Sequence, residues 1–216
     1  MIDILLLKKN IIPFLVGAKA SLCIAFFSFL IGLLIGSVLA FFLLSKNVLL
    51  QSIGLIYITI IRGTPMLLHI MLLFLFLPLI GFILPVQMVA ILAIGLNSAA
   101  YMSQVIKTGI ESVSSGQQEA ARSLGLTRFQ TFLFIIFPQG LKTIFPMLKN
   151  EAVTLIKDSS LASVIGVFEI SQQGQLIASS TYDALTAYVG VGIAYLLLTF
   201  LVSFFFYLIE RRFFYA

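Results

Sequence analysis

"ASLCIAFFSFLIGLLIGSVLAFFLL", residues 20–44, contains no charged side chain. About 20 consecutive apolar residues are enough for a helix to cross the hydrocarbon core of a bilayer. The stretch therefore predicts a transmembrane helix. Within it, Gly32 and Gly36 have the GxxxG spacing that lets a second helix approach closely.

The composition of the whole chain agrees with this prediction. Of its 216 residues, 61% are hydrophobic and 10% are charged, and the mean hydropathy is +1.15. A soluble domain of this length needs more charged surface to stay in solution. The sequence thus predicts an all-α, polytopic membrane protein with a single domain that covers residues 1–216.

Outside the first span, apolar runs predict four more transmembrane helices, at residues 50–77, 86–107, 151–170 and 184–209. Pro78, Gly81 and Pro85 separate the first two of these. Residues 151–170 include charged side chains, which in a membrane face a protein interior or an aqueous path. The opening "MIDILLLKKN" lacks the basic start and the cleavage site of a secretory signal, and it predicts a short interfacial helix.

Lysine and arginine side chains indicate the orientation, because cytoplasmic loops carry an excess of them. Five spans place the two termini on opposite sides of the membrane. With the carboxy terminus inside, the cytoplasmic connections contain Lys46, Lys107, Arg122, Arg128, Lys142, Lys149, Arg211 and Arg212. The outer side contains Lys8, Lys9 and Lys19, and residues 171–183 include no basic side chain. We therefore expect the amino terminus outside and a cytoplasmic loop at residues 111–138.

Few side chains are suited to catalysis or to metal binding. Cys23 is the only cysteine, which excludes an intramolecular disulfide and a thiolate metal cluster. His69, the only histidine, lies in an apolar run and is interpreted as a helix-packing residue. The sequence predicts no catalytic residue and no metal site. The net charge of +5 does not indicate nucleic-acid binding, because the basic residues lie near predicted helix ends.

The predicted cytoplasmic loop contains a polar segment, "GQQEAARSLGLTRFQTFLFIIFP", at residues 116–138. Ser115 and Gln118 have the spacing of a capping box, and Glu119 is expected in the first turn of a helix, where the dipole favours an anion. Gly125 is expected to end this helix in a left-handed conformation. Such a helix either docks in a groove of another protein or lies in solvent.

A second helix is predicted after the glycine. Thr127 and Gln130 have capping-box spacing, and apolar residues then recur with the period of a helix at Phe129, Phe132, Leu133 and Ile136. Pro138 is expected to interrupt this helix. The segment is thus predicted to contain a short helix, a glycine hinge and an interfacial helix.

Glu119-Ala120-Ala121, followed by Gly125 and by "IIFP" ending at Pro138, resembles the EAA motif of ABC importer permeases. Three further stretches resemble the polar amino acid branch of that family, of the basic amino acid type. They are "IIRGTPML" at residues 60–67, "NSAAYMSQVIKTGIESV" at 97–113 and "LIKDSSLASVIGVFEI" at 155–170. The branch commonly has Glu where this chain has Gln104, and Leu where it has Phe137.

The resemblance implies a bacterial inner-membrane importer with two permease subunits, two cytoplasmic ABC ATPases and an external solute-binding protein. It also implies that the ATPase-coupling residues are Glu119, Ala120, Ala121, Arg122 and Gly125. The chain contains no G-x-x-x-x-G-K-[ST] phosphate loop, so ATP and magnesium are expected on the partner subunit. Because five helices offer little wall for a pathway, a homodimer or a pair with a related permease is expected.

Two helix faces predict a substrate site. Residues seven and eighteen apart share a helix face, so Glu151, Asp158 and Glu169 are expected in one acidic stripe, with Thr154 on the same side. Asn97, Tyr101 and Gln104 are expected to share the facing side of span three. Facing stripes would enclose a polar, acidic cavity.

A helix break is predicted in span two, where Thr64 can cap and Pro65 suits the first helical position. The new helix start or Arg62 would receive the α-carboxylate of a substrate. Lys157 is interpreted as a structural residue that pairs with Asp158 or Arg62.

These residues predict the permease of an ATP-driven importer for polar, cationic amino acids of the arginine, lysine or histidine type, with alternating access powered by the partner ATPase. Two alternatives remain open. The chain could be an ion-coupled secondary carrier that uses Glu151 and Asp158 as a proton relay. It could also be an intramembrane enzyme, although no nucleophile and base pair is visible in the sequence.

Overall fold

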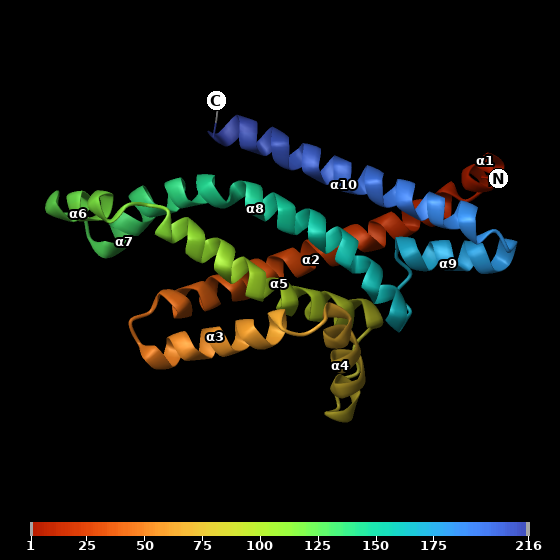
Figure 1. The fold of residues 1–216 in the computed structure, drawn as a ribbon, viewed down its shortest axis with the longest axis horizontal. Coiled ribbons are helices and arrows are strands. Elements are labelled where there is room, and N and C mark those ends of the chain that lie inside the picture. The colour runs from red at the N-terminus through yellow and green to blue at the C-terminus, as the bar shows by residue number, and fades with distance from the viewer. Residues whose placement is uncertain (1, 215–216) are drawn as a thin grey trace.

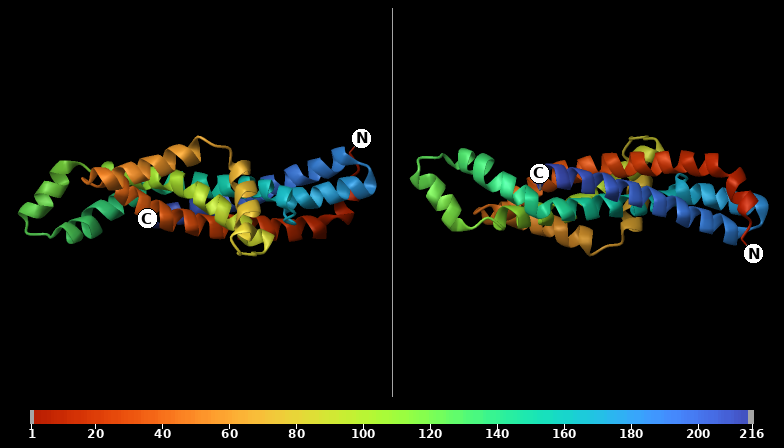
Figure 2. Two further views of the ribbon diagram at one scale, coloured as in Figure 1. Left: turned by 90° about the horizontal axis from the view of Figure 1, so that it is seen from below. Right: turned by 90° about the horizontal axis from the view of Figure 1, so that it is seen from above.

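The computed structural model describes residues 2–214, and these form an elongated bundle of helices (Figure 1). No strand occurs in the described part, which confirms the predicted all-α class. The polar helix α6 (Ser115–Ser123) lies at one end of the long axis, and the amino terminus lies at the other (Figure 2). Four helices in the described range are long and apolar enough to cross a membrane, or five if one bent pair counts as a span.

The short helix predicted at the amino terminus is α1 (Ile4–Lys9), which Asp3 caps through bonds from the amides of Leu5 and Leu6. The first long helix, α2 (Ile11–Leu44), begins earlier than residue 20 and includes Lys19. Its glycines make a close helix contact, as their spacing predicted. A Cβ at Gly32 would lie 2.7 Å from Ser98 Oγ, so the small Ser98 side chain packs directly against the bare backbone of Gly32.

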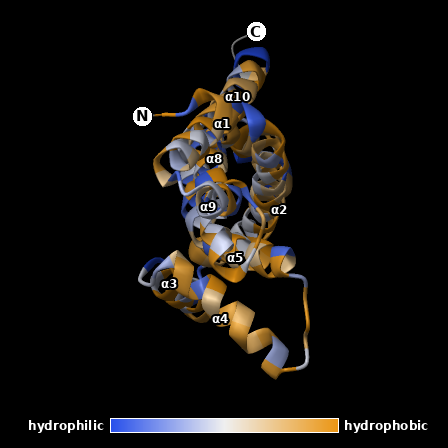
Figure 3. Cartoon of the chain, turned by 90° about the vertical axis from the view of Figure 1, so that its right-hand side faces the viewer, coloured by the Kyte–Doolittle hydropathy of each residue, from blue (hydrophilic) through white to orange (hydrophobic). Residues whose placement is uncertain are grey.

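The span predicted at residues 50–77 is not one continuous helix, as the break predicted at Thr64 and Pro65 indicated. The chain instead forms α3 (Val48–Arg62) and α4 (Met66–Leu79), whose axes differ by 102°. Figures 1 and 3 show α4 as an apolar arm that leaves the direction of the bundle. The break between Arg62 and Met66 is where it was predicted, but Pro65, and not Thr64, occupies the N-cap position of α4. Thr64 instead bonds back to the preceding helix, whose C-cap is Gly63: the Thr64 hydroxyl donates to Ile60 O at 2.8 Å.

Helix α5 (Val86–Glu111) is the centre of the bundle and contacts α2, α3, α4 and α8. It begins where the third span was predicted and ends four residues later than residue 107. Small residues on α5 allow the close packing, and a core of fully buried aliphatic side chains forms between the helices. That core includes Ile24, Ile70, Ile94, Leu155 and Ile156. The core holds α5 firmly, so its polar side chains have defined positions.

The fourth span begins much earlier than residue 151. Helix α7 (Arg128–Thr131), the π-helical segment η1 (Phe132–Ile136), α8 (Phe137–Asp158) and the 3₁₀ segment η2 (Ser159–Ile165) form one helical stretch. Lys142 and Lys149 therefore lie in a helix and not in a loop. Pro138 does not interrupt this stretch, since it stands in the first turn of α8, directly after η1. The wider π turn before the proline accommodates its ring and its missing hydrogen-bond donor, so the helical stretch continues.

A left-handed glycine ends the fourth span. Gly166 has φ +82°, and α9 (Ile170–Thr181) follows, a helix that was not predicted. Glu169 is fully buried and caps α9, accepting bonds from the amides of Ser171 and Gln172 and from the hydroxyl of Tyr195. The predicted acidic stripe is therefore wrong in its third member, because Glu169 is not on the helix of Glu151. The last span, α10 (Ala184–Phe214), begins where it was predicted and extends beyond residue 209.

Candidate functional site

A polar cavity of about 320 Å³ lies where the turn between α3 and α4 meets α5 and α8. Its lining consists of Thr64, Met66, Asn97, Tyr101, Glu151, Thr154 and Asp158. Two of the predicted faces thus meet here, one on α5 and one on α8. The bend between α3 and α4 adds a third wall, which a straight second span would not provide.

Glu151 is held in this cavity by a direct hydrogen bond. The hydroxyl of Ser98, on α5, donates to Glu151 Oε1 at 2.6 Å. Ser98 is buried against α2, where Gly32 leaves room for it. The packing of α2 on α5 therefore determines where this carboxylate lies. Glu151 keeps a second oxygen for which no bond is seen within the described residues.

Asn97 is buried on the opposite wall and is tied to the α3–α4 turn through a histidine. The Nδ2 atom of Asn97 lies 3.1 Å from His69 Nδ1, and His69 Nε2 lies 2.6 Å from Thr64 Oγ1. His69 was interpreted from the sequence as a packing residue. It is indeed buried in the helix contact, but both of its ring nitrogens have polar partners, and both partners line the cavity.

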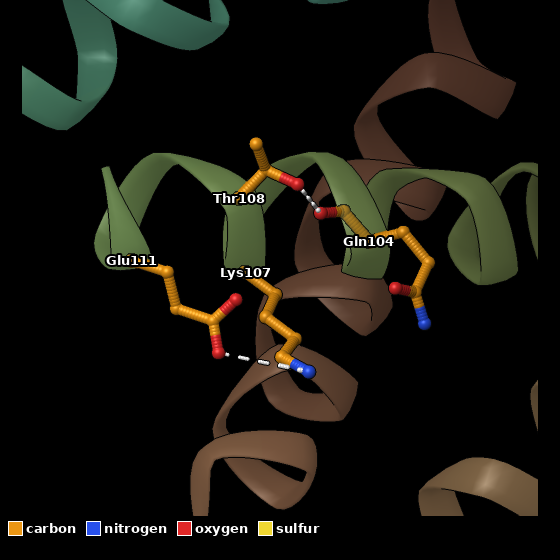
Figure 4. Close-up of polar contacts among 4 residues, drawn as sticks. All are labelled: Gln104, Lys107, Thr108 and Glu111. Atoms are coloured by element: carbon orange, nitrogen blue, oxygen red, sulfur yellow. Dashed lines mark hydrogen bonds and ion pairs between the residues drawn. The ribbon is translucent and has the colours of Figure 1, made fainter.

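Arg62 and Gln104, two further predicted site residues, do not line the cavity. The guanidinium carbon of Arg62 lies 5.1 Å from the ring centroid of Tyr101, in a cation–π contact at the edge of the cavity. Gln104 lies further along α5 than Tyr101. Figure 4 shows it near Lys107, which pairs with Glu111 at 3.6 Å.

Lys157 was expected to pair with Asp158 or Arg62, but no ion pair joins these side chains within the described residues. Lys157 is exposed on α8 and does not line the cavity. Both carboxylates of the cavity, those of Glu151 and Asp158, thus stand without a basic partner within ion-pair distance. The cavity is consequently acidic and rich in hydrogen-bond acceptors.

A second polar region lies at the far end of the bundle, around α6 (Figure 2). Gly125 has φ +87°, as predicted for the residue that ends this helix. The amide of Gly125 donates to Arg122 O and that of Leu126 donates to Ala121 O, which is the Schellman pattern of helix termination. Glu119, Ala120 and Arg122 are exposed, whereas Ala121 is buried.

The start of α6 differs from its prediction. Ser114 is the N-cap and makes no side-chain cap bond, and Gln118 donates to Val113 O instead of closing a capping box with Ser115. The helix begins one residue earlier than expected, so Glu119 lies in the second turn and not the first. The second capping box is confirmed: Thr127 accepts from the amide of Gln130, whose side chain accepts from the amide of Thr127.

Three features of the cavity were missed from the sequence. Ser98 gave no signal, because a serine inside a span is usually a small packing residue. Met66 enters the lining only because of the sharp bend after Arg62. His69 stands five residues after Thr64, but nothing in an apolar run shows that the two side chains meet across a helix start.

Comparisons with known proteins agree on one family. The family model described as the binding-protein-dependent transport system inner membrane component matches residues 9–215. The chain is 36% identical over 211 residues to the nopaline transport system permease protein NocM of Agrobacterium fabrum, covering 93% of this chain and 88% of that protein. It is 34% identical over 204 residues to the glutamine transport system permease protein GlnP of Escherichia coli, covering 93% of each.

Solved structures show the same fold. A crystal structure of an amino acid ABC transporter with histidines superposes with a TM-score of 0.89 at 34% identity, covering 98% of this chain and 99% of that one. An inward facing structure of the MetNI methionine ABC transporter superposes with a TM-score of 0.77 at 20% identity, covering 92% and 95% of the two chains. The second likeness concerns the fold alone.

Proposed function

Since the chain belongs to the inner membrane components of binding-protein-dependent transport systems and is an amino acid ABC importer permease, we propose that it transports cationic amino acids. The observation that supports this proposal is the pair of carboxylates, Glu151 and Asp158, in one cavity with no basic partner in ion-pair distance. A guanidinium or ammonium group of the substrate would supply the missing charge.

The electrostatic argument rests on the cost of burying charge. Leaving an ion without a partner away from water costs several kcal/mol, so a cavity with two carboxylates favours a cation and disfavours an anion. Asn97 and Tyr101 lie across from the acids and would bind the polar part of the substrate. Arg62, which contacts Tyr101 at the edge of the cavity, would bind the α-carboxylate of the substrate.

The importer also needs parts that this chain does not supply. We place ATP and magnesium on a cytoplasmic ATPase pair that docks at α6 through Glu119, Ala120, Arg122 and Gly125, with Ala121 packing beneath them. An external solute-binding protein would deliver the amino acid at the opposite end. The amino terminus is then outside and the carboxy terminus inside, and two copies of this chain, alternating their access, enclose the pathway.

The test compares Glu151→Gln and Asp158→Asn with wild type in the complete importer, reconstituted in vesicles. Each variant removes one charge and keeps the shape of the side chain. We expect uptake of labelled arginine to fall about tenfold, the loss that about 1.4 kcal/mol produces, while uptake of glutamine changes less. Glu111→Gln is the matched control, since Glu111 is an exposed acid outside the cavity, and it should leave both rates near wild type.

Equal loss of arginine and glutamine uptake in the two variants would show that these acids only hold the helices together. Dependence on ATP separates the importer from an ion-coupled carrier. Uptake by this chain alone, in vesicles without an ATPase subunit, would contradict the division of labour proposed here. A monomer that transports without a second permease copy would contradict the dimer.

A further inference from the structure

The hydrogen bonds around His69 have a fixed direction. The hydroxyl of Thr64 has one hydrogen, and it is donated to Ile60 O at 2.8 Å. Thr64 Oγ1 must therefore accept at its 2.6 Å contact with His69, which places the ring hydrogen on Nε2. In the neutral ring, Nδ1 is then an acceptor.

The acceptor at Nδ1 determines how the amide of Asn97 is turned. Only the Nδ2 end of that amide can donate, and it lies 3.1 Å from His69 Nδ1. The carbonyl oxygen Oδ1 thus points away from the imidazole. Oδ1 has no hydrogen bond within the described residues and is not a buried unpaired atom, while Asn97 lines the cavity. The oxygen therefore has accessible surface and no partner among the described residues.

We propose that His69 is a positioning residue that presents the Asn97 oxygen, and not the Asn97 nitrogen, to the amino acid in the cavity. This inference rests on the proposed function of the cavity as the substrate site. With Oδ1 turned inward, the wall opposite Glu151 and Asp158 also accepts hydrogen bonds, which suits an ammonium or guanidinium group. The reversed amide would direct two hydrogens at the same cation and would compete with it for the carboxylates.

His69 is suited to this role because it is rigid and enclosed. It is 8% exposed, and it joins the start of α4 to the middle of α5. Its partner Thr64 is held in turn by the carbonyl group of Ile60, in the last turn of α3. The sharp bend between α3 and α4 thus places the Thr64 hydroxyl and the His69 imidazole so that they form one hydrogen-bonded chain with Asn97.

The experiment measures equilibrium binding of labelled arginine, lysine, histidine and glutamine to the detergent-purified permease–ATPase complex without binding protein. Arginine is the main probe. His69→Leu keeps the volume but cannot accept a hydrogen bond, and we expect it to raise the Kd for arginine about tenfold. His69→Gln can accept from Asn97 and donate to Thr64, and we expect it to stay within about threefold of wild type.

Further variants make the test specific. Thr64→Ala should weaken binding about threefold, whereas Thr64→Ser keeps the hydroxyl and the affinity. In the Asn97→Ala background, His69→Leu should have no further effect, because His69 acts through that amide. Ser28→Ala is the matched control for a lost buried hydrogen bond, since Ser28 donates to Ile91 O in the α2–α5 contact away from the cavity, and its Kd should equal that of wild type.

Several results would contradict the positioning role of His69 and leave the cavity as the substrate site. They are a Kd for His69→Leu within twofold of wild type, an equal weakening by His69→Gln, or additive effects of His69→Leu and Asn97→Ala. Failure of the wild-type complex to bind any of the four amino acids would instead reject the cavity as the substrate site. The two failures are thus distinguishable in one set of measurements.

Discussion

The two polar regions of this apolar chain are built in opposite ways. The α6 end consists of neighbouring residues, from Ser114 to Thr127, and most of its side chains are exposed. The cavity takes its lining from residues as far apart as Thr64 and Asp158, and Asn97 and Ser98 beside it are buried. Local backbone chemistry is therefore enough to form the first region, whereas the second exists only when four helices have packed.

This difference predicts how each region responds to substitution. A change at the α6 end should alter docking of a partner and leave the bundle intact. A change near the cavity should be transmitted through packing, because interiors are close-packed and respond to a single added methyl group. The following substitutions test that contrast, from the largest expected effect to the smallest.

Gly125→Val and Glu119→Lys should abolish uptake while the bundle stays folded. Valine at φ +87° is strained by about 1–3 kcal/mol, so the turn after α6 must change its path. Glu119 is exposed, so its charge reversal acts on the docking surface and not on the core. Uptake, ATP hydrolysis and a melting curve of each complex provide the measurement.

Gly116→Val is the control for the valine substitution. Gly116 lies in the same helix, but its φ is not positive and a Cβ there would meet nothing within 4 Å. This variant should keep wild-type uptake. If Gly125→Val also transports normally, the left-handed turn has no part in coupling.

Gly32→Ala should reduce arginine uptake, although Gly32 does not line the cavity. The new Cβ would lie 2.7 Å from Ser98 Oγ and would displace the donor of Glu151. Overpacking of this kind costs about 1–3 kcal/mol, and arginine uptake should fall about threefold. Gly192→Ala, on α10 with open space around it, should be neutral in uptake and melting temperature. A Gly32→Ala variant that melts and transports like wild type would show that α2 does not determine the position of Glu151.

Thr127→Ala should have the smallest effect, because it removes one cap at the start of α7. Loss of the bond from the amide of Gln130 should cost about 1 kcal/mol locally. Amide hydrogen exchange should then become several times faster at residues 128–131 and stay unchanged in α5. A change in arginine binding would contradict the separation of the two regions.

Much of the fold could be predicted because membrane helices are long and their apolar runs are plain. The starts of α5 and α10 agree with the residues expected, and so does the left-handed Gly125. Helical periodicity also placed Asn97 beside Tyr101, and Glu151 beside Asp158, in faces that meet at the cavity. These features depend on local spacing and local backbone geometry, which the sequence carries directly.

The errors have a shared cause. Residues 128–150 contain two prolines and several polar side chains, so their hydropathy did not show that they continue into α8. Glu169 was placed on the wrong helix because the left-handed Gly166 ends the run before it. The third wall of the cavity depends on a 102° bend, and no periodicity reports an angle between helices. Tertiary geometry decides each of these points.

One contact between α5 and α8 has a mechanical consequence. A Cβ at Gly140 would lie 2.7 Å from Gly109 O, so the two helices touch there backbone to backbone. This contact, here called the pin, is the point about which α5 and α8 could tilt relative to each other. Counting residues at 1.5 Å each, Glu151 lies about 16 Å from this pin and Asn97 about 18 Å. A tilt of about 5° between the helices would therefore change the width of the cavity by about 1.4 Å, half the length of a hydrogen bond.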